Sequence, residues 1–486
     1  MTFALTIISC LAAGYLIVAL GWPRPAKRFS ELLLRASLSV GYGLGLFSLL
    51  FFLARVLGIS HLVAIDVVVL AMLCAAFLLI RTRILAAQSP VRSDENVRLP
   101  RWLDRCLTVS FTCAICGGLY SAILRSIAHP HGEGWDAFAI WNLHARFLFR
   151  GGEHWRDGLS PLIPWSHPDY PLLLPAAVAH FWSILGHEDT AVPALISLCF
   201  TLGTVGLLSS SLTILRGRTF GMLGGLALLS TPFFIEQGSS QYADVPLAYF
   251  FLAAMVLLHL HRRRLTESSD SLGQLLVLCG MAAGCAVWTK NEGLLFLSAM
   301  LVARVLVRIG WTFVLSTGMV TQRNRAETWA DLLKFAVGVA PFFLLVVWFR
   351  HSIAFSSELF SNQGTMLQRI LDPSRYGAIV KWFAKEFLRF GEWWLIPGTV
   401  LLIVLYFLGD TDGVDRRSGV DIRSSVWTLT LTLAGYFAIY MITPYDLYWH
   451  LRFSLNRLFL QLWPCAIFLF FLASPLKMGQ QSQNEP

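Results

Sequence analysis

Long apolar runs alternate with short polar loops along almost the whole chain. The first runs cover 3–21, 32–57 and 62–80, and comparable runs recur as far as 456–473. About 20 apolar residues in a helix are enough to cross the ~30 Å hydrocarbon core of a bilayer. A helix also pairs its backbone polar groups within one segment, whereas these runs are too long for barrel strands and do not alternate. The pattern therefore predicts an all-α polytopic membrane protein.

The positions of lysine and arginine predict which loops face the cytoplasm. Cytoplasmic loops carry an excess of both residues, and they gather here in 22–31, 81–105, 216–218, 261–271, 304–331 and 410–424. The remaining polar loops are then outside, at 129–171, 237–244, 290–292, 350–392 and 444–455.

Three apolar stretches lie between the loops 129–171 and 237–244. Three crossings would put these loops on opposite sides of the membrane, so one stretch must not cross if both loops are outside. We expect it to be 172–186, because its length of about 15 residues is below the ~17 needed to span. The alternative is that the non-crossing piece lies within 191–236. The count becomes about thirteen transmembrane helices, with interfacial helices in the first large outer loop.

We divide the chain into four parts on this topology. They are N-terminal transmembrane helices with a basic cytoplasmic linker, a central module containing the loop 129–171, C-terminal transmembrane helices containing the loop 350–392, and a polar cytoplasmic tail that we expect to be disordered. Their ranges are 1–105, 106–349, 350–475 and 476–486.

Composition and charge agree with a membrane protein. Only 14% of the residues are charged and 56% are hydrophobic, whereas soluble domains carry about 25% charged residues. The net charge of +9 comes from the short basic loops that set topology, so we expect the lipid bilayer and no nucleic acid as a partner.

The loop 129–171 concentrates acidic, histidine and tryptophan residues. Asp136 lies where the chain leaves one membrane helix and enters an interfacial one. A carboxylate at a membrane boundary beside imidazoles and indoles is typical of a functional site, and the alternative role is a helix N-cap. Arg146, ten residues later, is a candidate to pair with Asp136 or to bind a phosphate.

Three further polar clusters fall on the same outer face, in QYADVP, in WTKNEG and in the stretch DLYWHLRFSLNRL. Their candidate residues are Asp244, Lys290, Glu292, His450, Arg452 and Arg457. Lys290 can neutralise a phosphate as a point charge. Arg457 opposes the positive-inside trend, which phosphate binding or snorkelling to lipid head groups would explain. Asp244 can alternatively cap its helix.

Together these motifs resemble the membrane-embedded glycosyltransferases of the C-type superfamily (GT-C), in the protein O-mannosyltransferase-like and aminoarabinose-transferase-like branch. In that family an acidic residue lies in the first large outer loop, as Asp136 does in GWDAFAIWN, and a second outer aspartate precedes a span, as Asp244 does in QYADVP. The HPDYPL stretch, with His167 and Asp169, is similar to a His-Pro-Pro-Leu-like element of the family. Ala137 stands where the mannosyltransferases have a second acid.

The resemblance implies transfer of a sugar from a polyprenyl-phosphate donor to an acceptor glycan, lipid or protein on the periplasmic face of a bacterial inner membrane. Asp136 would be the catalytic base of an inverting reaction. The substrate-binding candidates are Arg146, His167, Asp169, Asp244, Lys290, Glu292, His450, Arg452 and Arg457.

No cofactor is assigned, and a divalent metal stays open with Asp136, Asp244 and His131 as candidate ligands. Two other classes also stay open. One is a transporter or flippase for a lipid-linked sugar, although no internal repeat is evident and the charges lie at the outer boundary. The other is an O-antigen polymerase or ligase-like protein, which would share the polyprenyl donor.

Overall fold

Helices joined by turns and loops make up the computed structural model. It describes residues 2–22, 26, 28–84, 100–267, 274–314, 322–354, 363–393 and 419–474. Within these residues every regular element is a helix. The apolar run 393–409, which predicts a further span, lies outside the described part of the chain apart from Trp393, as does the expected tail 476–486.

The helices occur in the following order. The N-terminal half contains α1 (Thr2–Gly21), α2 (Phe29–Val56), α3 (Leu62–Ile84), α4 (Arg101–Ala128), η1 (Ala137–Trp141), α5 (Asn142–Arg150), η2 (Gly152–Leu159), η3 (Pro164–Ser166), α6 (Leu173–Leu185), α7 (Ala191–Arg216), α8 (Arg218–Leu229) and α9 (Pro232–Ser239). The C-terminal half contains α10 (Asp244–Glu267), α11 (Gln274–Thr289), α12 (Asn291–Val314), α13 (Gln322–Ser352), α14 (Gln363–Leu371), α15 (Pro373–Arg389), α17 (Gly419–Ile442) and α18 (Leu447–Ala473).

The described helices agree with the predicted class of an all-α polytopic membrane protein. Nine are long and apolar enough to cross a membrane, or up to ten if the bent pair α8 and α9 is counted as one span. The helix α6, in the stretch expected not to cross, has 13 residues. At 1.5 Å per residue it is about 20 Å long, which is shorter than the ~30 Å hydrocarbon core.

The apolar stretch expected at 219–236 is divided into two helices. The helix α8 ends at Leu229 and α9 starts at Pro232, with a bend of 70° between them. Proline lacks a backbone N–H and fits the first turn of a new helix better than the interior of an old one. Pro232 therefore favours a break here, and the pair forms either a broken span or a re-entrant segment.

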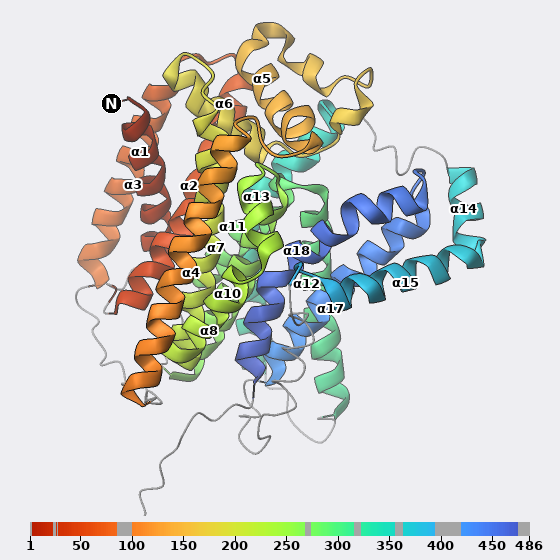
Figure 1. Cartoon of the computed structure of the whole chain (residues 1–486). Helices are drawn as coiled ribbons and strands as arrows, with labels where there is room; N and C mark the ends of the chain where they lie inside the picture. The colour runs from red at the N-terminus through yellow and green to blue at the C-terminus, as the bar shows by residue number, and fades with distance from the viewer. Residues whose placement is uncertain are drawn as a thin grey trace, which may run out of the picture.

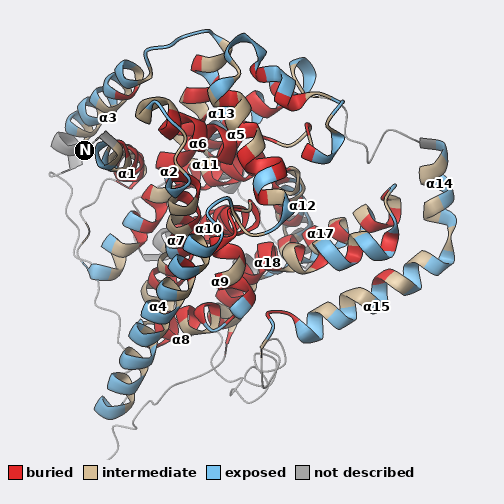
Figure 2. Cartoon of the chain, turned by 45° about the horizontal axis from the view of Figure 1, so that its top comes forward, coloured by how far each residue is buried: buried red, intermediate tan, exposed pale blue. Residues whose placement is uncertain are grey.

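The centre of the bundle is α10. It packs against α7, α11 and α18, and its most apolar window is completely buried. Figure 2 shows buried residues gathered around α10 and exposed residues along much of α4 and α15. A helix that is apolar on all sides is expected to be enclosed by other helices, and this position fixes Asp244 at the buried end of α10.

Two glycines let α11 and α13 approach each other closely. A Cβ atom at Gly280 would lie 2.1 Å from the carbonyl oxygen of Phe335, and one at Gly338 would lie 2.0 Å from that of Val277. Small residues permit such close backbone packing between membrane helices, where dispersion forces replace the hydrophobic effect as the main attraction. The contact positions the Lys290 end of α11.

Short helices cover one end of the bundle. The segments η1, α5 and η2 lie above the long helices in Figure 1, and α5 packs against α6. These are the helices expected in the loop 129–171. The loop 350–392 contains α14 and α15, which extend away from the side of the bundle (Figure 1).

Candidate functional site

A chain of alternating charges joins four segments at the end of the bundle that η1 and α5 cover. Arg457 donates from Nη1 to the carboxylate of Asp136, and the same nitrogen lies 3.7 Å from Asp244 Oδ2. Lys290 Nζ lies 2.9 Å from Asp244 Oδ1 and 3.0 Å from Glu292 Oε1. We call these five residues the charge network.

Three helix ends and one position inside α18 bring the charge network together. Asp136 immediately precedes η1, Asp244 is the first residue of α10, and Lys290 lies between α11 and α12, directly before the turn that carries Glu292. Arg457 comes from the third turn of α18. Polar groups that end several spans at one level can therefore pair, although 321 positions separate Asp136 from Arg457.

Exposure within the charge network is highest at Asp136 and lowest at Asp244, and it rises again to 12% at Glu292. The side chains of Asp136 and Arg457 are 25% and 17% exposed, whereas those of Lys290 and Asp244 are 7% and 1% exposed. A proton acceptor must reach the group that gives up the proton. Asp136 is therefore the carboxylate of the charge network that is best placed to accept a proton from a bound molecule. The buried Asp244 carboxylate is placed to hold the surrounding side chains together.

The side chain of Asp136 does not cap the helix that follows it. The residue has helical backbone angles and makes no side-chain hydrogen bond to the first turn of η1. By contrast, Asp446 before α18 accepts a hydrogen bond from the backbone nitrogen of Trp449 at 2.8 Å. The capping role considered for Asp136 is wrong for this structure, because its carboxylate faces Arg457 instead.

Gln461 contacts Asp244 directly, and Tyr436 in turn contacts Gln461. Gln461 donates from Nε2 to Asp244 Oδ1 at 2.6 Å, and its Oε1 accepts from the hydroxyl of Tyr436 at 2.6 Å. Gln461 follows Arg457 by four residues, so both project from the same face of α18. A buried carboxylate needs such partners, since an unpaired buried charge is strongly destabilising.

Lys290 is held in its charged form. Burial by itself would lower the pKa of its amine, but the carboxylates of Asp244 and Glu292 outweigh burial and raise the pKa. The amine also lies 6.0 Å from the centre of the Tyr170 ring. Lys290 thus supplies a fixed positive charge beneath the aromatic residues of the loop 129–171.

Stacked rings form a wall beside the charge network. Tyr170 stacks on Trp141 with ring centres 5.6 Å apart and on His167 with ring centres 4.6 Å apart. His167 has a positive φ of 51°, which is uncommon for a residue other than glycine. Burial lowers the pKa of His167 below its ordinary value, so this histidine is neutral at pH 7 and can act as a hydrogen-bonding group.

Asp169 is tied to the helices beneath the loop. Asn291 donates from Nδ2 to Asp169 Oδ2 at 2.8 Å, and Asn291 Oδ1 accepts from Arg350 Nη2 at 2.6 Å. This link connects the HPDYPL stretch to the start of α12 and the end of α13. It explains how His167 and Asp169 come to lie near Lys290.

Other predicted residues lie apart from the charge network. Arg146 pairs with Glu188, at 3.3 Å, so the predicted pairing with Asp136 is wrong. Arg452 is exposed and its guanidinium lies against Phe453 of the same helix, 5.6 Å from the ring centre.

His450 and His131 are also outside the charge network. His450 Nδ1 forms a hydrogen bond of 2.9 Å with Thr443 Oγ1. His131 is exposed, and its backbone oxygen accepts from Asn142.

The candidate metal ligands do not fit a divalent ion. Asp136 and Asp244 are both engaged by cations of the charge network, and the side chain of His131 is exposed elsewhere. Across the described residues, no three His, Cys, Asp or Glu side chains gather as a metal site. We therefore derive no step through a metal.

Several residues of the site were not singled out in the sequence. Gln461 and Tyr436 could have been found, because a polar group within an apolar span marks a site or a partner. Asn291 and Tyr170 carry no such signal, since a polar hairpin and an aromatic residue at a membrane boundary are both ordinary.

Comparison with family models, with curated proteins and with solved structures finds no match to this chain. The likeness to GT-C enzymes rests on the motifs quoted above. The functional conclusion is accordingly drawn from those motifs and from the geometry of the charge network.

Proposed function

We propose that the protein is a membrane-embedded glycosyltransferase that moves a sugar from a polyprenyl-phosphate donor to an acceptor outside the cytoplasm. The observation that carries the proposal is the partly exposed Asp136 carboxylate before η1, paired with the Arg457 guanidinium from the third turn of α18. A base beside a phosphate-binding cation is what this reaction requires. The surrounding spans supply apolar surface for the lipid tail.

Arg457 is the first cation that a donor phosphate meets in the charge network. Its side chain is more exposed than that of Lys290, 17% against 7%, and a guanidinium can bind phosphate oxygens through two parallel hydrogen bonds. A phosphate bound to Arg457 competes with Asp136 for the same N–H groups. Donor binding therefore frees the Asp136 carboxylate to act as a base.

The transfer is a single displacement. An acceptor O–H or N–H group attacks the anomeric carbon, and the bond between that carbon and the phosphate oxygen breaks. The electron pair leaves with the polyprenyl phosphate, whose charge Arg457 and Lys290 stabilise. The acceptor proton goes to Asp136, and the sugar inverts its anomeric configuration.

We also propose about thirteen spans, with the charge network facing the periplasm of a bacterial inner membrane. The short α6 and the arginine-rich loops support this topology. Alkaline phosphatase fused after Gly186 should be active, and a fusion after Gly217 should be inactive. The reverse pattern would show that α6 crosses the bilayer and that the topology is wrong.

Cell-envelope analysis tests the activity. Mass spectrometry of glycolipids and glycoproteins should reveal a glycosylated product that disappears when the protein is absent. The variant Asp136→Asn should lose transfer by about 10²–10⁴-fold, which is the usual contribution of a positioned base. Asp157→Asn is the matched control, because Asp157 belongs to the same outer loop and its side chain is 66% exposed.

These measurements distinguish a glycosyltransferase from a transporter and from a polymerase. A well-expressed Asp136→Asn protein that glycosylates at the original rate would refute the assignment of the base. Movement of a lipid-linked sugar across proteoliposomes, with no new covalent bond, would identify a transporter. Formation of a repeating glycan would identify a polymerase.

A further inference from the structure

A cavity separate from the charge network lies at the turn between α2 and α3. Its volume is about 730 Å³, within the ~300–1,000 Å³ of pockets that bind small molecules. Residues 59–64 form much of its wall, and α6 contributes Ser183 and Ile184. The proposed reaction makes no use of this cavity.

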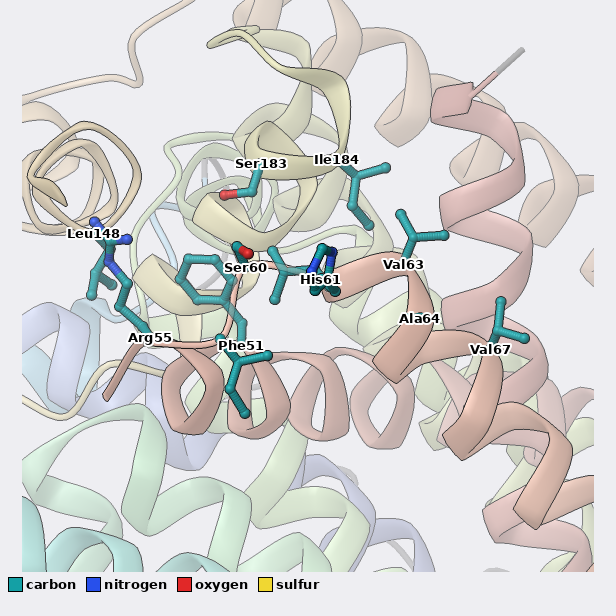
Figure 3. Close-up of a pocket in the computed structure, with 12 residues that line it drawn as sticks. Phe51, Arg55, Ser60, His61, Val63, Ala64, Val67, Leu148, Ser183 and Ile184 are labelled. Carbon is teal, nitrogen blue, oxygen red and sulfur yellow. The ribbon is translucent and has the colours of Figure 1, made fainter. Parts of the chain in front are cut away.

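Its lining is polar at one end and apolar at the other. Figure 3 shows Arg55 near Leu148 on one side, Ser60 and His61 in the middle, and Val63 and Val67 on the far side. Val63 and Val67 are 58% and 60% exposed. The apolar end therefore opens toward the hydrocarbon that surrounds α3.

Arg55 is a cation without an acidic partner among the described residues. Its Nη2 donates to the backbone oxygen of Gly152 at 2.8 Å, while its buried Nε has no hydrogen-bond partner. No carboxylate of the described residues lies within ion-pair distance of it. The cavity wall likewise contains no aspartate or glutamate.

The position of Arg55 opposes the positive-inside trend. The turn after α2 lies at the same end of the bundle as α5, the end that we propose faces outward. An arginine in the last turn of a helix gains some stabilisation from the helix dipole, but that does not account for a cavity beside it. A ligand with negative charge accounts for both the cavity and the unpaired arginine beside it.

We propose that this cavity binds an anionic glycerophospholipid of the outer leaflet, with its phosphate at Arg55, Ser60 and His61 and its acyl carbons along Val63 and Val67. A charged guanidinium without an acidic partner among the described residues is suited to a phosphate oxygen. The absence of a carboxylate from the described wall favours phosphatidylglycerol over phosphatidylethanolamine, whose ammonium would have no counter-charge.

The lipid site is distinct from the charge network. Leu148 lines the cavity and lies twelve positions after Asp136 along the continuous helix of η1 and α5, a distance of about 18 Å at 1.5 Å per residue. The bound lipid would join the turn after α2 to α5 and α6, and so hold the outer loop in place. The lipid proposal does not depend on glycosyl transfer.

Native mass spectrometry of the purified full-length protein tests the site. We expect saturable binding of dioleoyl-phosphatidylglycerol, with dioleoyl-phosphatidylethanolamine bound at least about tenfold more weakly. Arg55→Gln should lower the affinity for phosphatidylglycerol about tenfold, because it removes a charge-assisted hydrogen bond. Arg156→Gln is the control, since Arg156 is an exposed arginine of the same outer region and does not line the cavity.

A second variant addresses the case in which Arg55→Gln fails to fold. Val63→Trp keeps every polar group and fills the apolar end, so it should weaken binding of both lipids. Equal binding of the two lipids, or unchanged binding by the variants, would overturn the proposal. Competition by soluble glycerol 1-phosphate would also overturn it, since the ligand would then be a free phosphate. Asp136→Asn should bind phosphatidylglycerol normally, which keeps this test separate from that of the glycosyltransferase.

Discussion

Lys290 offers the sharpest test of the charge network. Its amine lies between two carboxylates, 2.9 Å from Asp244 and 3.0 Å from Glu292, and the Lys290 and Asp244 side chains are 7% and 1% exposed. The variant Lys290→Met keeps most of the side-chain volume and removes the charge. Removal of one partner from a buried ion pair leaves an uncompensated charge and costs about 3–5 kcal/mol. We expect a loss of this size in the free energy of unfolding.

The double variant Asp244→Asn/Lys290→Met separates charge from shape. Replacement of both members of a buried pair by neutral groups of similar volume is often neutral, so the double variant should recover much of the loss. Unfolding of the original protein, of Asp244→Asn, of Lys290→Met and of the double variant, by titration with a denaturing detergent and followed by tryptophan fluorescence, would give the four free energies of a double-mutant cycle. A coupling energy near zero would refute the pairing, as would a Lys290→Met protein as stable as the original.

Three other predictions concern residues outside this pair. Burial lowers the pKa of His144 to about 3, below the value of about 6.5 in an unfolded chain. The contribution of the neutral His144 side chain to the stability of the fold is therefore complete above pH 6.5. It falls by about 1.4 kcal/mol for each pH unit as the pH drops from 6.5 to 3. Hydrogen exchange of α5 measured against pH should show this loss, and His144→Gln should flatten that profile. Gln461→Leu removes the hydrogen-bond donor to Asp244 and the acceptor for the Tyr436 hydroxyl. It should lower the free energy of unfolding, measured by the detergent titration used for the Lys290 variants, by about 1–3 kcal/mol. A change below ~0.5 kcal/mol would contradict these hydrogen bonds. Gly280→Ala places a Cβ 2.1 Å from a carbonyl oxygen of α13 and should lower the midpoint temperature of thermal unfolding. Gly117→Ala is the control, since no atom lies within 4 Å of its new Cβ and the midpoint should not change. Equal midpoints for the two variants would show that α11 and α13 are not closely packed.

The candidate residues that meet in the charge network each lie at or next to the end of a predicted span. Residues that terminate apolar helices meet the same membrane boundary, so Asp136, Asp244, Lys290 and Arg457 could be assigned to one level from the sequence. A shared depth in the membrane did not, however, predict which of these side chains form ion pairs with one another. Arg146, ten residues after Asp136, was a candidate to pair with it or to bind a phosphate, yet Arg146 pairs with Glu188, and Asp136 pairs with Arg457 of a distant helix.

The sequence by itself determined the class of the protein and the level of its polar groups. Both follow from local physics, since a backbone in lipid must satisfy its hydrogen bonds within each helix and a charge costs least at a helix end. Only the tertiary structure decided which helix ends meet, how α8 and α9 bend at Pro232, and that Gln461 supports Asp244. Those outcomes depend on close packing between helices far apart in the chain, such as the contact at Gly280 and Gly338, which no local pattern records.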